Sequence, residues 1–241
     1  MPDSWLVLKL EAPLLAFGGV TIDQLGVTRD FPAISMLTGL LANALGWRRE
    51  EWEKHQALQD RLVFACRWDR RDASALTDTQ NAQLAKNDRG WTTWGQPEGR
   101  GGDSYNAPHR RFRDYHTNAS MIVTLSVRPA DETPTLDELA AALDRPARPI
   151  FIGRKPCLPS APLRQKDFVV APTAYQALQR VPAPDGDAVA MRAIWPADNG
   201  PTDGQEVHRI IDLQDLRIWR TGLHGGSRKV VEGIVVPREA E

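Results

Sequence analysis

The order of the expected elements predicts an α+β fold in which one sheet carries helices on one face. Short apolar, β-prone runs alternate with runs of helical period in the order β-α-β, and this order recurs after an interruption. The interruption is a long, polar, glycine-rich stretch, about 69–117. After about residue 160 only short β-like runs remain, which indicates a smaller, irregular, β-rich carboxyl-terminal part.

The first expected strand covers residues 5–10, which are apolar and β-prone. Pro13 should end it, because proline cannot donate a backbone hydrogen bond to a sheet. Residues 11–34 hold several glycines and a proline without a helical period, so they predict a loop.

A helix should follow this loop. Ser35 fits its N-cap, apolar residues recur at helical spacing through 36–45, and Gly46 stands where glycine ends helices. A second helical stretch over about 50–60 and an apolar strand over 62–68 complete the first half of the pattern.

The second half begins after the insertion with a strand over 120–127, where apolar residues alternate with others. Thr135 and Glu138 form a capping-box pattern, which predicts a helix that ends before Pro146. A short fourth strand is expected over 150–152. The resulting βαββαβ order is that of the ferredoxin-like fold.

The remaining chain supports a division into two parts. Four short β-like runs follow, at 189–195, 207–213, 216–219 and 229–236. We therefore expect a ferredoxin-like domain over 1–160, with its insertion at about 69–117, and a small β-rich region over 161–241.

Composition excludes several classes of protein. The formal net charge is −1, which argues against a generally basic nucleic-acid-binding surface but leaves room for a local basic patch. Cys66 and Cys157 are the two cysteines and lie far apart, so neither a disulfide framework nor a zinc module is expected. Without a signal peptide or a long apolar run, we expect a cytoplasmic protein with no membrane contact, metal or cofactor.

Two basic segments are the strongest functional signal. Arg110, Arg111 and Arg113 are interleaved with aromatic residues, and 145–166 contains no acidic residue. The basic residues of this second segment are Arg145, Arg148, Arg154, Lys155, Arg164 and Lys166. Such a pattern suits single-stranded RNA, because guanidinium groups bind phosphates while rings stack on bases. Alternatively, these side chains pair with carboxylates or face water.

Two glycine-containing stretches could bind anions. Gly153, Arg154 and Lys155 follow the expected fourth strand, and 222–229 combines glycines with basic residues. Both lack the spacing of a phosphate-binding P-loop, and both also fit ordinary turns. In the glycine-rich insertion, Trp91, Trp94 and Tyr105 are candidates for partner contacts.

Evidence for catalysis is weak. No serine-hydrolase or zinc-protease motif occurs, and Cys66 lies inside an expected strand. Tyr115, His116 and Lys155 could together support metal-free RNA cleavage as a base, an acid and a cation. No spacing constrains these three residues, so structural roles explain them more simply.

Six sequence blocks stand out along the first two thirds of the chain. They are LKLEAPLLAFG at 8–18, TRDFP at 28–32, SMLTGLL at 35–41, ALG at 44–46, RDYH at 113–116 and IFIGRKPCLP at 150–159. These blocks resemble the CasD family, in the family's order between residue 6 and about residue 163. CasD is the subunit of the type I-E CRISPR complex Cascade that binds the 5′ handle of the CRISPR RNA (crRNA).

The resemblance implies a ferredoxin-like domain of the RAMP type, with residues 69–117 as a thumb-like hairpin. It implies a non-catalytic subunit of a ribonucleoprotein complex in antiviral defence. Such a subunit would bind the crRNA 5′ handle, cap the filament of Cascade backbone subunits and help to anchor the large subunit. It would meet target DNA only through the complex.

The resemblance and the basic segments together give a set of expected RNA contacts. Arg29 and Ser35 should lie at the junction of loop and helix. The base of the hairpin should contribute Arg110, Arg111, Arg113 and His116. Arg154 and Lys155 should lie on the loop after the fourth strand.

Two other functions stay open at this point. The first is a metal-free endoribonuclease that cuts the CRISPR repeat, as the related subunit of type I-C systems does. The second is a purely structural subunit that meets RNA only through its neighbours.

Overall fold

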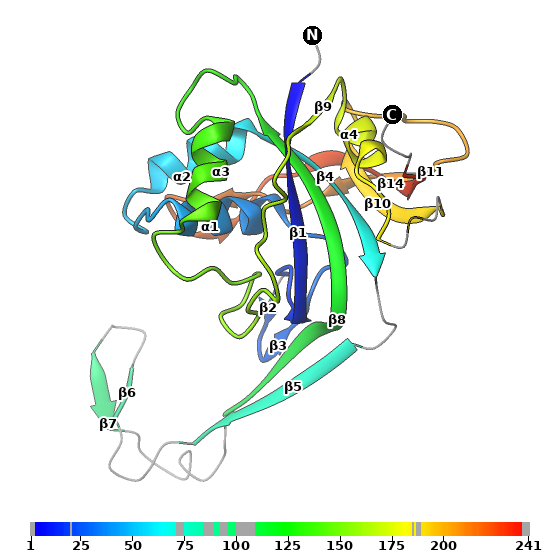
Figure 1. Ribbon diagram of the computed structural model, residues 1–241. Helices are drawn as coiled ribbons and strands as arrows, with labels where there is room; N and C mark the ends of the chain where they lie inside the picture. Colours follow the sequence, from blue (N-terminus) through cyan, green and yellow to red (C-terminus); the bar gives the residue numbers. More distant parts are fainter. Residues whose placement is uncertain are drawn as a thin grey trace.

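The computed structural model describes residues 3–19, 21–70, 75–83, 89–91, 96–99, 109–184, 186 and 189–237. Within these ranges a ten-stranded sheet dominates the molecule (Figure 1). Its main path runs β11-β14-β10-β4-β8-β1-β9, and the short strand β3 and the longer β5 pair with β8 beside this path. The protein is therefore of the mixed α+β class, as predicted.

The amino-terminal part supplies the long strands and three helices. Its elements are β1 (Asp3–Leu15), β2 (Thr21–Ile22), β3 (Leu25–Gly26), α1 (Ile34–Ala44), α2 (Trp52–Arg61), β4 (Leu62–Arg70), β5 (Ala75–Ala82), β6 (Arg89–Trp91), β7 (Pro97–Gly99), β8 (His109–Val127) and α3 (Leu136–Asp144). The helices and strands expected over 36–45, 50–60, 62–68, 120–127 and 135–143 are all present.

The carboxyl-terminal part continues the same sheet. Its elements are β9 (Val169–Ala171), α4 (Ala174–Arg180), β10 (Met191–Pro196), β11 (Val207–Leu213), β12 (Arg217–Ile218), β13 (Leu223–His224) and β14 (Arg228–Val235). The four predicted β-like runs correspond to β10, β11, β12 and β14. Because β10 pairs with β4, the later strands extend the sheet that the earlier strands begin.

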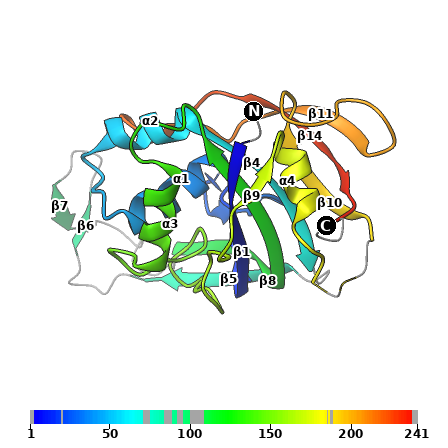
Figure 2. The same cartoon turned by 45° about the horizontal axis from the view of Figure 1, so that its top comes forward.

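Side-chain alternation along β1 builds two cores, one on each face of the sheet. Leu6, Leu8 and Leu10 point to the face that packs against α1 and α3. Trp5 and Val7 point to the opposite face, where they pack with α4 and the strands β10 and β14. Figure 2 shows α1, α2 and α3 together on one side of β1 and β8, with α4 on the other. The sequence analysis expected helices on one face and missed α4.

The fourth strand expected over 150–152 is wrong. Those residues lead into a turn, and the edge position beside β1 is taken by β9, whose three residues pair antiparallel with β1. The backbone N–H of Ile152 donates to the carbonyl of Cys157 at 2.8 Å, so the turn uses a donor that a strand would offer to its neighbour. The first strand is also longer than predicted. It runs past Pro13, where no pairing with β8 is recorded between Ala12 and Leu14.

Two predicted signals at helix ends are confirmed, one at the start of α3 and one at the end of α1. Thr135 and Glu138 form a complete capping box at α3. Gly46 follows α1 with a φ of +80°, a conformation that glycine adopts without strain. Its N–H donates to the carbonyl of Asn43, and the N–H of Trp47 donates to that of Ala42, which is the Schellman arrangement.

The insertion contains a hairpin arm. β5 pairs antiparallel with the first part of β8, from Ala75 opposite His116 to Ala82 opposite His109. This arm projects away from the body of the molecule (Figure 1). No helix in the described part of the chain is long and apolar enough to cross a membrane. The described residues also contain no cluster of three or more potential metal ligands.

Candidate functional site

A cleft of about 330 Å³ brings together segments that are far apart in the sequence. Its walls come from the loop between β1 and α1, one face along most of α1, the loop 151–154 and the stretch 215–224. Three of the expected RNA contacts line it, namely Arg29, Ser35 and Arg154. The cleft therefore gathers residues that the sequence could only propose separately.

Gly153 allows two of these walls to meet. Its φ is +83°, and a Cβ atom at this position would lie 1.6 Å from the carbonyl oxygen of Ala16. Any side chain would collide with that backbone, so only glycine fits. The turn is closed by Cys157, whose N–H donates to the carbonyl of Arg154 at 2.8 Å.

Ser35 has a different role from the predicted one. The N-cap of α1 is Ala33, and Ser35 lies in the first turn with only 9% of its surface exposed. Asp215 supplies the missing cap from the carboxyl-terminal part: its Oδ2 accepts from the Ile34 N–H at 3.0 Å. A distant carboxylate thus replaces the local serine, and Arg228 pairs with this carboxylate at 2.9 Å.

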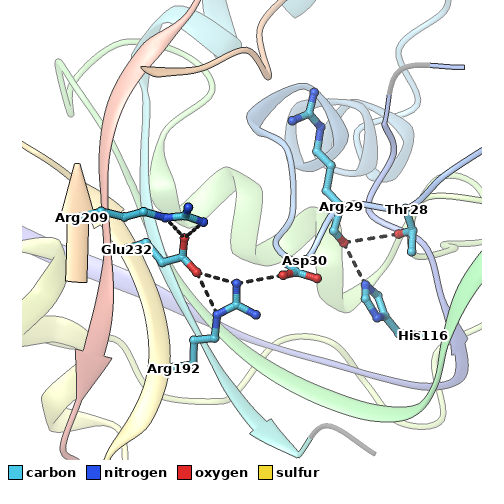
Figure 3. Close-up of polar contacts among 7 residues, drawn as sticks. All are labelled: Thr28, Arg29, Asp30, His116, Arg192, Arg209 and Glu232. Atoms are coloured by element: carbon cyan, nitrogen blue, oxygen red, sulfur yellow. Dashed lines mark hydrogen bonds and ion pairs between the residues drawn. The ribbon is translucent and has the colours of Figure 1, made fainter. Parts of the chain in front are cut away.

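Arg29 lines the cleft and lies beside a neighbouring ionic cluster (Figure 3). Its side chain donates to the carbonyl of Gln214 at 2.6 Å and lines the cleft. Its own carbonyl oxygen is 2.8 Å from Nε2 of His116. His116 is buried between Phe17 and Trp68, at ring distances of 5.4 and 5.1 Å. It supports the position of Arg29 from inside the protein.

The ionic cluster contains Glu232, Arg192, Arg209 and Asp30 (Figure 3). Glu232 accepts from Arg209 at 2.7 Å and also pairs with Arg192, which reaches Asp30 at 2.8 Å. Burial by itself would raise the pKa of Glu232, but hydrogen bonds from the two arginines outweigh it and hold the pKa below its ordinary value. These arginines are therefore already paired.

The guanidinium of Arg154 already makes contacts within the protein. It donates to the carbonyls of Asp114 at 2.9 Å and Gly26 at 2.8 Å, and its guanidinium lies 5.0 Å from the centre of the Tyr115 ring. Tyr115 is itself buried. The neighbouring Lys155 is exposed, so it is the more accessible cation of this loop.

The arginines predicted at the base of the arm lie further along it, because Arg110, Arg111 and Arg113 are opposite residues 81, 80 and 78 of β5, whereas His116 is at the base. In the turn between β2 and β3, the carbonyl of Asp23 accepts from Arg111 at 3.1 Å and the next carbonyl, of residue 24, accepts from Arg113 at 3.4 Å. Arg110 and Arg111 are exposed and Arg113 is half-buried, so all three keep some accessible surface. The other predicted contacts of the insertion are not described: Trp94 and Tyr105 fall outside the described residues, as does the side chain of Trp91.

The carboxyl-terminal part adds cleft residues that the sequence analysis did not propose. Arg217, Trp219 and His224 line the same cleft as Arg29. The basic stretch 222–229 was the available signal, and His224 falls within it. For Arg217 and Trp219 the sequence predicted only a short β-like run. No local pattern indicates that β12 lies against α1 and α2.

Comparisons with known proteins identify the family of this chain. The family model described as CRISPR-associated protein, Cas5, matches residues 5–231. The chain belongs to the Cas5 family. It is 30% identical over 160 residues to the Cascade subunit CasD of Escherichia coli strain K12, an alignment that covers 66% of this chain and 69% of that protein.

Two solved structures are similar to this Cas5 protein over 97% of its length. A chain of a CRISPR RNA-guided surveillance complex matches with a TM-score of 0.71 and 21% identity, over 90% of that chain. A structure described as a Cas protein matches with a TM-score of 0.61 and 23% identity, over 98% of its chain. These likenesses establish the fold.

Proposed function

We propose that this Cas5 protein is a non-catalytic subunit of a type I CRISPR Cascade complex and that it binds the 5′ handle of the crRNA. The observation that carries the proposal is the cleft, where Arg29, Ser35 and Arg154 meet from three separate segments. Membership of the Cas5 family and the similarity to a Cascade subunit support it.

RNA in this cleft would meet exposed cations along one side. Lys155 follows the cleft residue Arg154 in the chain, and RNA that leaves the cleft along the arm would meet Arg110 and Arg111 on β8. Phosphates would bind these cations, while the shape of the cleft would select a folded or splayed strand over a regular duplex. Because His116 is buried, we assign it to the support of Arg29 and not to the RNA surface.

The assembly roles belong to the same proposal. The subunit would cap the filament of backbone subunits, help to anchor the large subunit and meet target DNA only through the complex. The fold fits a RAMP-type, ferredoxin-like domain, because the strands β9, β1, β8 and β4 lie side by side and all neighbours are antiparallel.

Burial favours the non-catalytic function over the endoribonuclease. Tyr115 is 3% exposed and His116 is 7% exposed, so the acid and the base of the alternative mechanism are both covered. Burial also raises the pKa of the Cys66 and Cys157 thiols, which disfavours the thiolate form that a nucleophile needs. Of the candidate catalytic groups, only Lys155 is exposed.

Binding of labelled repeat RNA by the purified full-length chain tests this function. We expect the repeat to bind more tightly than a scrambled RNA and to remain uncut in EDTA. Lys155→Gln should weaken binding and reduce the slope of log K against log salt by about 0.7, the value for one phosphate contact on a single strand. Arg154 is unsuitable as the first variant, because its loss would also release the carbonyls of Gly26 and Asp114.

Lys54→Gln is a matched control, since Lys54 is an exposed lysine outside the two basic segments and the stretch 222–229, and it does not line the cleft. It should leave affinity and salt slope unchanged. Equal affinity for repeat and scrambled RNA would contradict handle binding. Cleavage of the repeat at one position in EDTA would instead establish the endoribonuclease.

A further inference from the structure

The turn-containing segment β12–β13 is attached to α2 by a stack of side chains. The Trp219 ring lies 4.7 Å from the His55 ring on α2, and the guanidinium of Arg217 lies 5.0 Å from the Trp219 ring. Gln59 adds hydrogen bonds to the backbone of Arg217 and, at 3.1 Å, to the indole N–H of Trp219. These contacts hold Arg217 at a fixed position on the wall of the cleft.

The guanidinium of Arg217 has no acidic partner among the described residues. No ion pair or side-chain hydrogen bond is recorded for it, and its Nε is buried without a hydrogen-bond acceptor. A buried donor without an acceptor costs free energy, and no carboxylate in the described part of the chain offsets the charge of this side chain. The guanidinium lies over the Trp219 ring on one side, and its Nη2 atom lies toward Gly222.

A second arginine faces the same point. A Cβ atom on Gly222 would lie 3.2 Å from Nη2 of Arg217 and 3.3 Å from Nη2 of Arg49. Arg49 is exposed and likewise has no recorded acidic partner in the described part of the chain. Burial and then the positive charge of Arg49 lower the pKa of Arg217, as expected for two cations that lack a shared anion.

We propose that Arg217 and Arg49 form a phosphate subsite that binds one phosphodiester of the RNA strand in the cleft. The proposal rests on the proposed function and assigns a role to a region that the sequence left unexplained. A phosphodiester has two non-bridging oxygens that share one negative charge, and it can bridge two guanidinium groups through charge-assisted hydrogen bonds. RNA is favoured over an acidic peptide because the subsite is continuous with a cleft that Arg29 and Arg154 also line.

Nuclear magnetic resonance of the full-length chain, labelled with ¹⁵N-arginine, tests the subsite directly. The probe is the dinucleoside monophosphate UpU, which carries one phosphodiester, and the Arg217 signal is identified by its loss in Arg217→Gln. We expect UpU to shift the Nε–Hε signal of Arg217 saturably, and its neutral methylphosphonate analogue to leave it unshifted. Arg49→Gln should weaken the UpU affinity by about tenfold, the value of one charge-assisted hydrogen bond.

Arg220 provides the matched control, because it is an exposed arginine next to the same turn that does not line the cleft. Its signal should shift little with UpU. An absent shift at Arg217, or an equal shift at Arg220, would overturn the subsite. A larger shift of Arg217 with N-acetylglutamate than with UpU would indicate a carboxylate from a protein partner and would also overturn it.

Repeat-RNA binding separates this proposal from the proposed function. Arg217→Gln should weaken binding and reduce the salt slope by about 0.7, while Arg220→Gln should change neither. If the wild-type chain prefers the repeat but Arg217→Gln binds it equally well, handle binding stands and the subsite is wrong. If the wild-type chain shows no preference but UpU shifts Arg217, the subsite stands and handle binding is wrong.

Discussion

At the scale of single residues, Arg67 shows how a charge is held inside this protein. Its side chain is fully buried on the face of β4 that packs against α4. It donates to the carbonyls of Leu178 at 2.6 Å and of Val181 and Pro182 at 2.7 Å. It therefore satisfies the carbonyls at the end of α4, and it pairs with Asp69 at 2.8 Å.

We expect Arg67→Met to destabilise the protein by about 3–5 kcal/mol, because it leaves Asp69 and the helix-end carbonyls without their buried donor. Urea denaturation followed by circular dichroism measures the change in the free energy of unfolding. Arg70→Met is the control: Arg70 is 47% exposed and pairs with Glu11, so its loss should cost less than about 1 kcal/mol. Equal losses for the two variants would contradict the structural role of Arg67.

The sequence indicated which residues could contact RNA, but it did not predict the contacts that these residues make within the protein. It selected Arg154 from a basic segment without acidic residues, and His116 from a block that resembles the CasD family. It could not show that backbone carbonyls already occupy much of Arg154, or that His116 lies between two rings. Those facts depend on contacts between residues that are dozens of positions apart, which local patterns do not encode.

At the scale of elements, α1 depends on a residue from the other end of the chain. Asp215 is buried, caps the Ile34 N–H and pairs with Arg228. The guanidinium of Arg228 in turn lies 4.5 Å from the Phe64 ring in the core. The start of α1, which lines the cleft, is therefore fixed by the carboxyl-terminal part.

We expect Asp215→Ala to destabilise the protein by about 3–5 kcal/mol, since it removes the cap and leaves Arg228 as an unpaired, largely buried charge. The comparison is Thr135→Ala, which removes an ordinary, solvent-exposed cap from α3 and should cost about 1 kcal/mol. Both are measured by urea denaturation. A loss for Asp215→Ala no larger than that for Thr135→Ala would show that the distant cap contributes little.

The elements that were predicted correctly carry their own end signals. The capping box of α3 and the glycine after α1 lie within a few residues of the helices they define. The elements that were missed lack such signals or depend on distant partners. The cap of α1 comes from Asp215, which is distant in the sequence. The three-residue β9 depends on its antiparallel pairing with β1. Helix α4 is seven residues long, too short for a clear apolar period.

At the scale of the whole molecule, the two parts of the chain share one sheet, and both contribute to the core on its α4 face. β10 pairs with β4, so the sheet continues from the amino-terminal into the carboxyl-terminal part. Trp5 and Ile122 pack in the same cluster as Trp195 and Val231. The strand patterns predicted most of the strands but not this junction, because a strand's pattern does not specify its neighbour.

We therefore expect a chain of residues 1–160 to lack a cooperative urea transition and to bind a hydrophobic dye, because its Trp5 face would lose α4, β10 and β14. The full-length chain should unfold in one transition. Co-expression of 1–160 with 161–241 as separate chains is the control: the two should purify together, since the contacts between them are non-covalent. A soluble 1–160 chain with a cooperative transition of its own would instead establish residue 160 as the boundary of an independent domain, and the cleft would then form between two separately folded units.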